Sequence, residues 1–171
     1  MSPDDKDELS ENTEKLWNMV DDFRVGMLVT RPHDGAPRPR PMTLAQRDDE
    51  TITFVTARDA TLVEELERDS GCAISMQSDR KYVALRGLAE VVDEQSAIDE
   101  VWSETMRVWF PDGPSSGRIV LVRVGVLEGE FWDVSGVQLV RFLLKAAKAY
   151  AQGSKLGKEM NNPGMHGGVA L

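Results

Sequence analysis

The stretch of sequence that constrains the fold most reads Pro37-Arg38-Pro39-Arg40-Pro41-Met42-Thr43-Leu44. Prolines at every second position hold the residues before them in extended backbone and remove their own N–H groups. A strand here must therefore lie at the edge of a sheet, or one of its sides must face a ligand instead of a neighbouring strand. The spacing also directs the side chains of Arg38 and Arg40 to one face of the strand.

Two interpretations of this arginine pair are open. The guanidinium groups can bind a phosphate or a polar ring edge through paired hydrogen bonds. Alternatively, the segment is an exposed edge strand whose arginines are solvated. Composition alone does not separate the two.

The charge around the pair is unusual for this chain. The whole sequence of 171 residues has 20 Lys and Arg against 29 Asp and Glu, which gives a net charge of −9 and excludes a general nucleic-acid binder. Between Phe23 and Arg47, however, five arginines face a single acid, Asp34, so this segment carries +4. An acidic protein thus contains one basic segment.

Periodicity on either side of the basic segment predicts short strands with helices between them. Strands are expected over 25–30, 51–56, 72–77 and 82–92, with a last strand pair over 119–124 and 127–134. Helices are expected from Leu9 to Phe23 and over 60–68, 97–108 and 137–150. With about six strands and no strict βα alternation, the pattern predicts a mainly β fold, an antiparallel Greek-key barrel with peripheral α-helices.

The length predicts a single domain over 9–152 that includes the N- and C-terminal helices. Residues 1–8 are polar and are expected to be flexible. Residues 153–171 form a Gly- and Asn-rich tail, which we expect on the surface or on a partner. No apolar run of 18 residues and no apolar leader segment is found, so we expect a cytoplasmic protein without a membrane partner.

Common catalytic motifs are missing from the sequence. The chain has two histidines, His33 and His166, and one cysteine, Cys72, which predicts neither a metal site nor a histidine-based catalytic triad. No catalytic residue can be named. Any reaction must therefore take its chemistry from a cofactor, or there is no reaction.

Several short motifs carry a family resemblance when they are taken in order. They are Arg38-Pro39-Arg40-Pro41-Met42, Phe54-Val55-Thr56 before a short helix, Gly87, Trp102, Trp109-Phe110-Pro111-Asp112-Gly113, Phe131-Trp132-Asp133, and a tail that ends in Val169-Ala170-Leu171. In this order the chain resembles the pyridoxamine 5′-phosphate oxidase-like flavoproteins of the FMN-binding split-barrel fold, and within them the general stress protein 26 branch.

The resemblance implies a six-stranded split barrel that forms a homodimer with two FMN molecules at the subunit interface, with FAD or a deazaflavin left open. It places the flavin ring and ribityl chain along the arginine segment and implies that the second subunit's tryptophan at position 132 covers the flavin. The residues it nominates for the cofactor are Arg38, Arg40, Pro41, Met42, Phe54, Val55, Thr56, Arg58, Thr61, Leu62, Gln77 and Trp132.

One position departs from the family pattern. Leu62 stands where the family usually has a basic residue that reaches the flavin phosphate. Arg58, the arginine pair and the free N–H groups at the start of the short helix can compensate for it.

Three functions remain open at this point. The first is a flavin-dependent oxidoreductase that passes electrons between a reduced nicotinamide and a small acceptor. The second is a flavin-binding stress or sensor protein without enzymatic activity. The third is a dimeric interaction module that has lost the cofactor.

Overall fold

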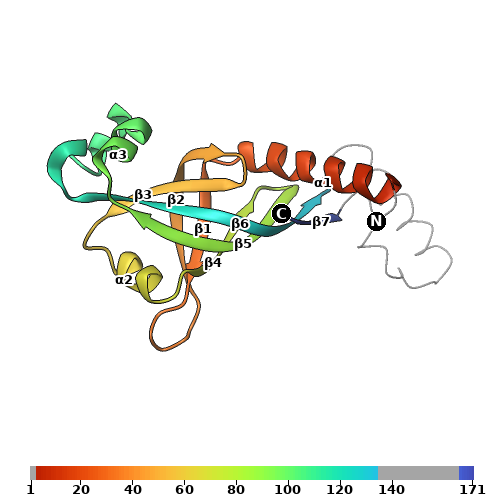
Figure 1. Cartoon of the computed structure of the whole chain (residues 1–171), viewed down its shortest axis with the longest axis horizontal. Coiled ribbons are helices and arrows are strands. Elements are labelled where there is room, and N and C mark those ends of the chain that lie inside the picture. Colours follow the sequence, from red (N-terminus) through yellow and green to blue (C-terminus); the bar gives the residue numbers. More distant parts are fainter. Residues whose placement is uncertain (1–2, 135–165) are drawn as a thin grey trace.

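The computed structural model describes residues 3–134 and 166–171 (Figure 1). Its helical segments are α1 (Pro3–Asp21), α2 (Thr61–Arg68), α3 (Gln95–Val101) and the 3₁₀ turns η1 (Glu104–Val108) and η2 (Pro114–Ser116). Its strands are β1 (Val25–Thr30), β2 (Arg38–Asp48), β3 (Thr51–Ala57), β4 (Gly71–Gln77), β5 (Lys81–Val92), β6 (Ile119–Asp133) and β7 (His166–Ala170). The expected helix over 137–150 lies outside the described residues.

The first six strands form a closed antiparallel barrel. Their order is β3-β2-β1-β4-β5-β6, and β3 also pairs with β6 to close the circle. After the β1-β2-β3 meander the chain returns through α2 and places β4 beside β1, which is the Greek-key connection. The predicted six-stranded antiparallel barrel with peripheral helices is thereby confirmed.

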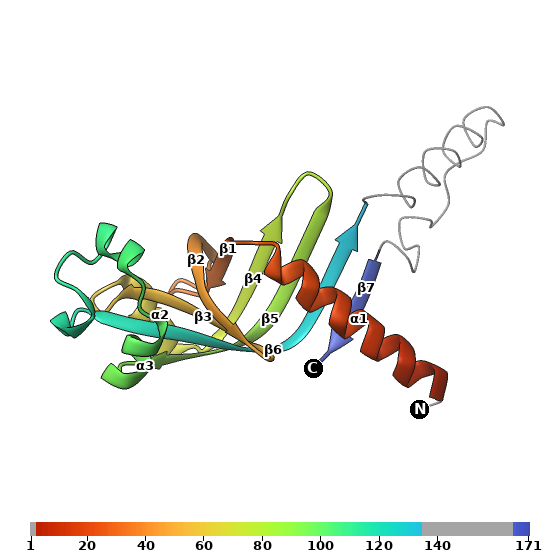
Figure 2. The same cartoon turned by 90° about the horizontal axis from the view of Figure 1, so that it is seen from above.

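The expected strand pair over 119–134 is wrong, because β6 runs without a break from Ile119 to Asp133. Its first half pairs with β3, and its second half pairs with β7 (Figure 2). The change of partner coincides with a bulge, where the register with β5 shifts between Arg86 and Gly87. Gly125 and Gly129 lie within this bent strand and not at a turn between two strands.

Of the tail expected over 153–171, residues 166–170 form a seventh strand, and residues 153–165 lie outside the described residues. β7 pairs with β6 from Glu128↔Ala170 to Trp132↔His166. Its sequence, His-Gly-Gly-Val-Ala, has only one buried apolar side chain, Val169, and therefore no alternating pattern that predicts a strand. β7 is a strand because the edge of β6 supplies its hydrogen-bond partners, and not because its own sequence has a strand pattern.

Helix α1 begins earlier than the sequence predicted, at Pro3 and not after residue 8. Proline is tolerated in the first helical turn and the acids that follow it are favourable there. The helix lies across the outer half of the sheet formed by β5, β6 and β7 (Figure 2). Its buried Leu16 approaches Gly129 so closely that a Cβ at that glycine would lie 2.6 Å from Leu16 Cδ2.

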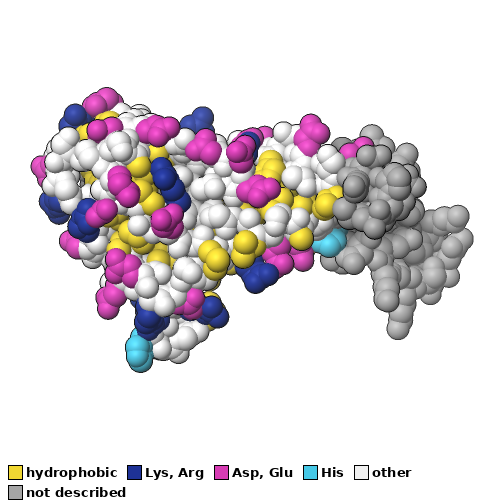
Figure 3. All heavy atoms as spheres, in the orientation of Figure 1, with side chains coloured by type: hydrophobic (Ala, Val, Ile, Leu, Met, Phe, Trp, Pro, Cys, Tyr) yellow, Lys and Arg dark blue, Asp and Glu magenta, His cyan; other side chains and the backbone are white. Residues whose placement is uncertain are grey.

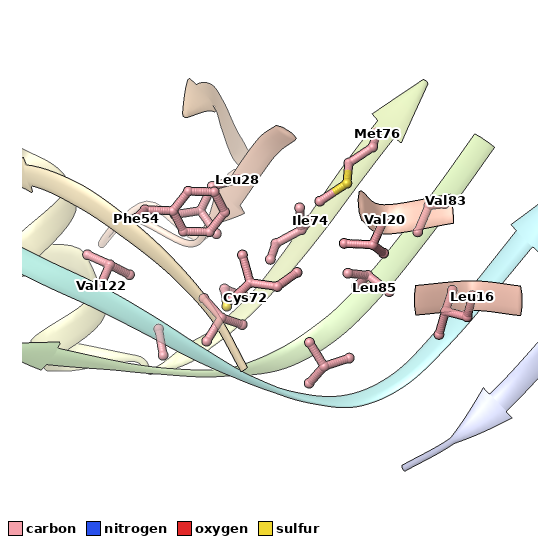
Figure 4. Packing of buried hydrophobic residues seen from close by; sticks show 14 of the residues in the cluster. Leu16, Val20, Leu28, Phe54, Cys72, Ile74, Met76, Val83, Leu85 and Val122 are labelled. Carbon is pink, nitrogen blue, oxygen red and sulfur yellow. The ribbon is translucent and has the colours of Figure 1, made fainter. Parts of the chain in front are cut away.

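The main core joins the barrel interior to the underside of α1. Figure 4 shows Phe54 and Leu28 facing each other from β3 and β1, with Ile74 of β4 beside them. Leu16 and Val20 of α1 pack over Leu85 and Val83 of β5 in the same view. A second cluster, made of Val92, Ile98, Val101, Ile119 and Leu121, closes the far end of the barrel under α3.

The helical stripe expected over 97–108 is divided into two shorter pieces. α3 ends at Val101, and η1 follows from Glu104. Val108 and Trp109 at the end of η1 are 80% and 78% exposed. No helix in the described part of the chain is long and apolar enough to cross a membrane.

Candidate functional site

The barrel opens where β2 separates from β3. The two strands pair from Asp48↔Thr51 to Leu44↔Phe54. Beyond that pair, residues 38–43 of β2 pair with β1, and residues 55–57 of β3 pair with β6. Within the described residues, no ladder joins these two segments, so each presents a strand edge toward a shared split.

The prolines of β2 determine which backbone hydrogen-bonding groups its open edge presents. Leu44 donates its N–H to the carbonyl of Arg24, on the β1 side of the strand. Because N–H directions alternate along an antiparallel strand, the nitrogens of Pro39 and Pro41 point away from β1, toward the split. The edge therefore presents the carbonyl groups of Pro39 and Pro41 and the N–H of Thr43, and the interpretation of residues 38–43 as an edge segment holds.

The two arginines of β2 converge on a buried carboxylate. Glu65 Oε1 accepts a hydrogen bond from Arg40 Nη2 at 2.7 Å and another from Arg38 Nη1 at 2.8 Å. Glu65 Oε2 accepts the hydroxyl of Thr30 at 2.7 Å, and Arg40 Nη1 donates to the same Thr30 Oγ1 at 2.7 Å. We call these four residues the Glu65 cluster; it links β1, β2 and α2 beside the split.

Burial is graded across the cluster. Thr30 is fully buried, and the side chains of Glu65, Arg40 and Arg38 are 8%, 20% and 48% exposed. The hydrogen bond from Arg40 holds the pKa of the Glu65 carboxyl below its ordinary value; burial opposes this effect, and the Thr30 hydroxyl supports it. The carboxylate is therefore a fixed negative charge beneath two arginines whose outer N–H groups lie nearer the solvent.

This arrangement predicts an acid-sensitive contribution to stability. Because the folded pKa of Glu65 is lowered, its stabilisation is complete above the ordinary glutamate pKa of about 4.3 and is lost as pH falls through the folded value. We expect the free energy of unfolding of the wild type to fall more steeply below about pH 5 than that of Glu65→Gln. Urea unfolding at several pH values measures both slopes, and equal slopes would contradict the prediction.

The nominated cofactor-binding residues on β3 and α2 differ in how far their side chains are exposed. Thr61 is exposed at the start of α2, with its hydroxyl 3.5 Å from Arg40 Nη2. Val55 and Thr56 are partly buried on the β3 side of the split. Phe54 is fully buried, and Leu62 is only 2% exposed in the main core. At positions 54 and 62, only the backbone is therefore in a position to meet a ligand in the split.

Arg58 has a partner of its own and acidic surroundings. Its guanidinium donates to Asp93 at 2.9 Å and to the carbonyl of Gly117 at 3.0 Å. The hollow that it lines with Thr61 also contains Asp59, Glu64, Glu67 and Asp93. Figure 3 shows acidic and basic side chains interspersed on the face that it presents. The arginine pair is thus the better anion site of the two.

Gln77 and Trp132 lie at the other end of the sheet. The register places Trp132 level with Tyr82 and Gln77, whereas Arg38 is level with Thr30. Following the register through β4, the two rows are five residues apart, which is about 16 Å along the strands. One subunit therefore does not bring Trp132 and the arginine pair together.

Trp132 also has a neighbour that the sequence did not suggest. Its ring stacks on His166 of β7, with centroids 4.9 Å apart and the planes inclined by 19°. The Nε2 atom of His166 lies 3.6 Å from Glu130 Oε2.

Thr30 and Glu65 of the site were not predicted from the sequence. An acid between the apolar Leu62 and Leu66 of a short helix is a signal that could have revealed a buried ion pair.

Comparison with known proteins finds a matching family model and solved structures with a similar fold. A family model described as "Pyridoxamine 5'-phosphate oxidase like" matches residues 11–157. No curated protein matches the chain.

Three of these solved structures illustrate the likeness. A protein of Jannaschia sp. CCS1 described as general stress protein 26 is 25% identical, with a TM-score of 0.69, over 95% of this chain and 99% of that one. The general stress FMN/FAD binding protein of Xanthomonas citri is 22% identical, with a TM-score of 0.64, over 74% and 92%. A Clostridium acetobutylicum protein related to general stress protein 26 is 15% identical, with a TM-score of 0.66, over 72% and 89%.

Proposed function

The chain belongs to the pyridoxamine 5′-phosphate oxidase-like family, and from that premise we propose that it binds a flavin in the split between β2 and β3. The observation that carries the proposal is the Glu65 cluster beside two open strand edges. The Xanthomonas citri relative is described as FMN/FAD binding, which agrees with a flavin as the ligand.

The groups around the split fit the chemistry of a flavin phosphate and ring. Arg38 and Arg40 keep outward N–H groups that can bind a phosphate. The Thr61 hydroxyl and the first N–H groups of α2 lie next to them and favour an anion further. The carbonyls of Pro39 and Pro41 and the N–H of Thr43 can pair with the polar edge of a ring.

A second copy of the chain would complete the site. The outer face of the barrel carries a row of exposed uncharged residues, Pro41, Met27, Ser75 and Ala84, on four adjacent strands. Such an uncharged face suits self-association by a twofold axis. In a homodimer, Trp132 and Gln77 of one subunit can approach the split of the other, which their own chain cannot achieve.

When bound, a flavin supplies two-electron redox chemistry to the site. The chain's own groups bind the phosphate, orient the ring and fix a carboxylate that is already neutralised by arginines. Around the split no protein acid or base is poised for proton transfer among the described residues. We therefore propose that the chain would hold a flavin for an oxidoreductase reaction of the general stress type, between a reduced nicotinamide and a small acceptor.

Titration of the purified chain with FMN and FAD tests the proposal. We expect flavin absorbance to remain with the protein and sedimentation to give a species of two chains with two flavins. Anaerobic addition of NADH or NADPH should then bleach the bound flavin. If the flavin binds but stays oxidised, the proposed binding holds and the proposed oxidoreductase activity is excluded. If no flavin binds, both proposals are excluded.

Arg40→Ala tests the site itself. Loss of a charge-assisted hydrogen bond to the phosphate is expected to weaken FMN binding by about 1.5 kcal/mol or more, which is at least roughly tenfold in Kd. Arg47→Ala is the matched control, since Arg47 is on the same strand but is held by Asp21 at 2.6 Å. Calorimetric titration should give an unchanged Kd for the control; equal losses in both variants would contradict the assignment of Arg40.

A further inference from the structure

We infer that His166 is a positioning residue for Trp132: its ring holds the indole in the orientation in which Trp132 is presented to the second subunit of a homodimer and to the flavin bound there. The inference rests on the proposed function and deepens it, because it gives β7 a role at the flavin site. His166 acts through Trp132 and does not itself touch the flavin.

Trp132 lies on the face of the sheet that α1 leaves open. Phe131, the residue before it, is 1% exposed in the main core beneath α1, so Trp132 points to the opposite face. The register pairs Trp132 with Tyr82, and Ala84 lies two residues further along β5 on the same face. Ala84 belongs to the uncharged row proposed for self-association. In a homodimer built on that row, Trp132 faces the second copy of the chain.

The contact that fixes the Trp132 ring comes from β7. Trp132 and His166 are directly opposed in the β6–β7 ladder, and their rings stack with centroids 4.9 Å apart and planes inclined by 19°. No other aromatic ring of the described residues stacks on Trp132. Aromatic rings paired across neighbouring strands favour one mutual arrangement, so the stack restricts the rotation of the indole.

The strand that carries His166 is itself held tightly in place. The next residue, Gly167, lies so close to the sheet and to α1 that a Cβ there would lie 2.5 Å from Phe131 Cζ and 3.0 Å from Asn12 Oδ1. A glycine at this position therefore allows the backbone of β7 to lie directly on its neighbours. The imidazole starts from a fixed backbone, one residue away, and can hold another ring in place.

The ring of His166, and not its hydrogen bonding, makes the contact with Trp132. The Nε2 atom is buried and has no hydrogen-bond partner among the described residues, and Glu130 Oε2 lies 3.6 Å from it, beyond hydrogen-bond distance. A buried polar atom without a partner costs free energy and contributes nothing to holding the ring. Phenylalanine, which has a ring and no such atom, is therefore expected to replace His166 in this role.

A fixed indole lowers the free-energy cost of covering a flavin. Trp132 is half-buried near the end of β6, where an unstacked indole can adopt more than one rotamer. Immobilising such a side chain on binding costs free energy, whereas a stacked ring has already lost that freedom during folding. His166 thus contributes to flavin affinity without a contact of its own.

A double-mutant cycle on the full chain tests the inference, with FMN or FAD as the probe, whichever the wild type binds more tightly. We expect His166→Ala to raise the Kd about threefold to tenfold, the effect of ordering one large side chain, and His166→Phe to stay within about twofold of the wild type. In a Trp132→Leu background, His166→Ala should change the Kd by less than about twofold, because a positioning residue acts only through the residue that it positions. Glu130→Gln is the matched control: it removes the charge beside His166 but leaves both rings, and it should leave the Kd unchanged.

The flavin-free chain provides a second readout. The near-UV circular dichroism of Trp132 is the difference between a protein and the same protein with Trp132→Phe, and it requires a fixed environment of the indole. We expect His166→Ala to lose more than about half of this difference signal and His166→Phe to keep most of it, with unchanged far-UV signals in both.

The outcomes separate the inference from the proposed function. A wild type that binds neither flavin overturns the proposed function and the role of His166 at the flavin site together. Flavin binding that His166→Ala leaves unchanged, or weakens equally with and without Trp132, overturns the inference alone. A loss of affinity that His166→Phe does not restore, or that Glu130→Gln reproduces, also overturns it, as does a Trp132 signal that persists in His166→Ala.

Discussion

Replacing Phe54 with alanine is expected to lower the free energy of unfolding by about 3–5 kcal/mol, the usual cost of removing a buried phenyl ring. Phe54 is fully buried and is among the largest side chains of the main core. It faces Leu28 in Figure 4, and its backbone pairs with Leu44 on one side and Val122 on the other. The ring thus anchors β3 at the last pair before β2 and β3 separate.

The control for this prediction is Phe110→Ala. Phe110 has the same side chain, but it is only partly buried and packs against the smaller cluster under α3. We expect a loss of less than about half that of Phe54→Ala, since the cost scales with the apolar area that is removed from the core. Urea midpoints at neutral pH measure both, and similar losses would show that Phe54 has no special place in the barrel.

Gly87→Ala is the second substitution with a large expected effect. A Cβ at this position would lie 2.4 Å from the carbonyl oxygen of Gly125 and 2.9 Å from Val124 Cγ1. The first of these atoms is backbone, so it cannot rotate away, and the β5–β6 ladder must shift at its bulge. We expect destabilisation of about 3 kcal/mol, at the upper end of overpacking costs.

Gly125→Ala separates this clash from the general effect of adding a methyl group to a glycine. Gly125 pairs with Leu88, the residue after Gly87, but the nearest atom to its added Cβ is the Leu88 carbonyl oxygen at 3.9 Å, an ordinary contact. Its thermal midpoint should stay within a few degrees of the wild type. If the two alanine variants were equally unstable, crowding at Gly87 could not be the cause.

Much of the fold could be predicted because its strands have clear local patterns. Buried and exposed residues alternate along β4 and β5, and the sequence predicted both strands almost to their ends. The prolines of β2 predicted an edge because the absence of N–H groups is a local property. Barrel closure and the antiparallel order follow from several short strands and from the lack of βα alternation.

Other features depend on contacts that no local pattern records. β7 has one buried side chain and becomes a strand only because β6 offers a free edge. The pairing of Glu65 with Arg38 and Arg40 joins residues 27 and 25 positions apart, so the pair looked like free basic charge in the sequence. The distance between Trp132 and the arginine pair became clear only from the strand register. Which candidates bind the cofactor remains a prediction.

The proline-bearing edge of β2 has a consequence for how the protein behaves at high concentration. A split barrel must leave a strand edge open, and an open edge is a template on which a strand of another molecule can add and begin aggregation. At Pro39 and Pro41 this edge has no N–H to donate, so an incoming strand would lose every second hydrogen bond. The same two residues that keep the split accessible to a small ligand therefore protect it against amyloid-like growth.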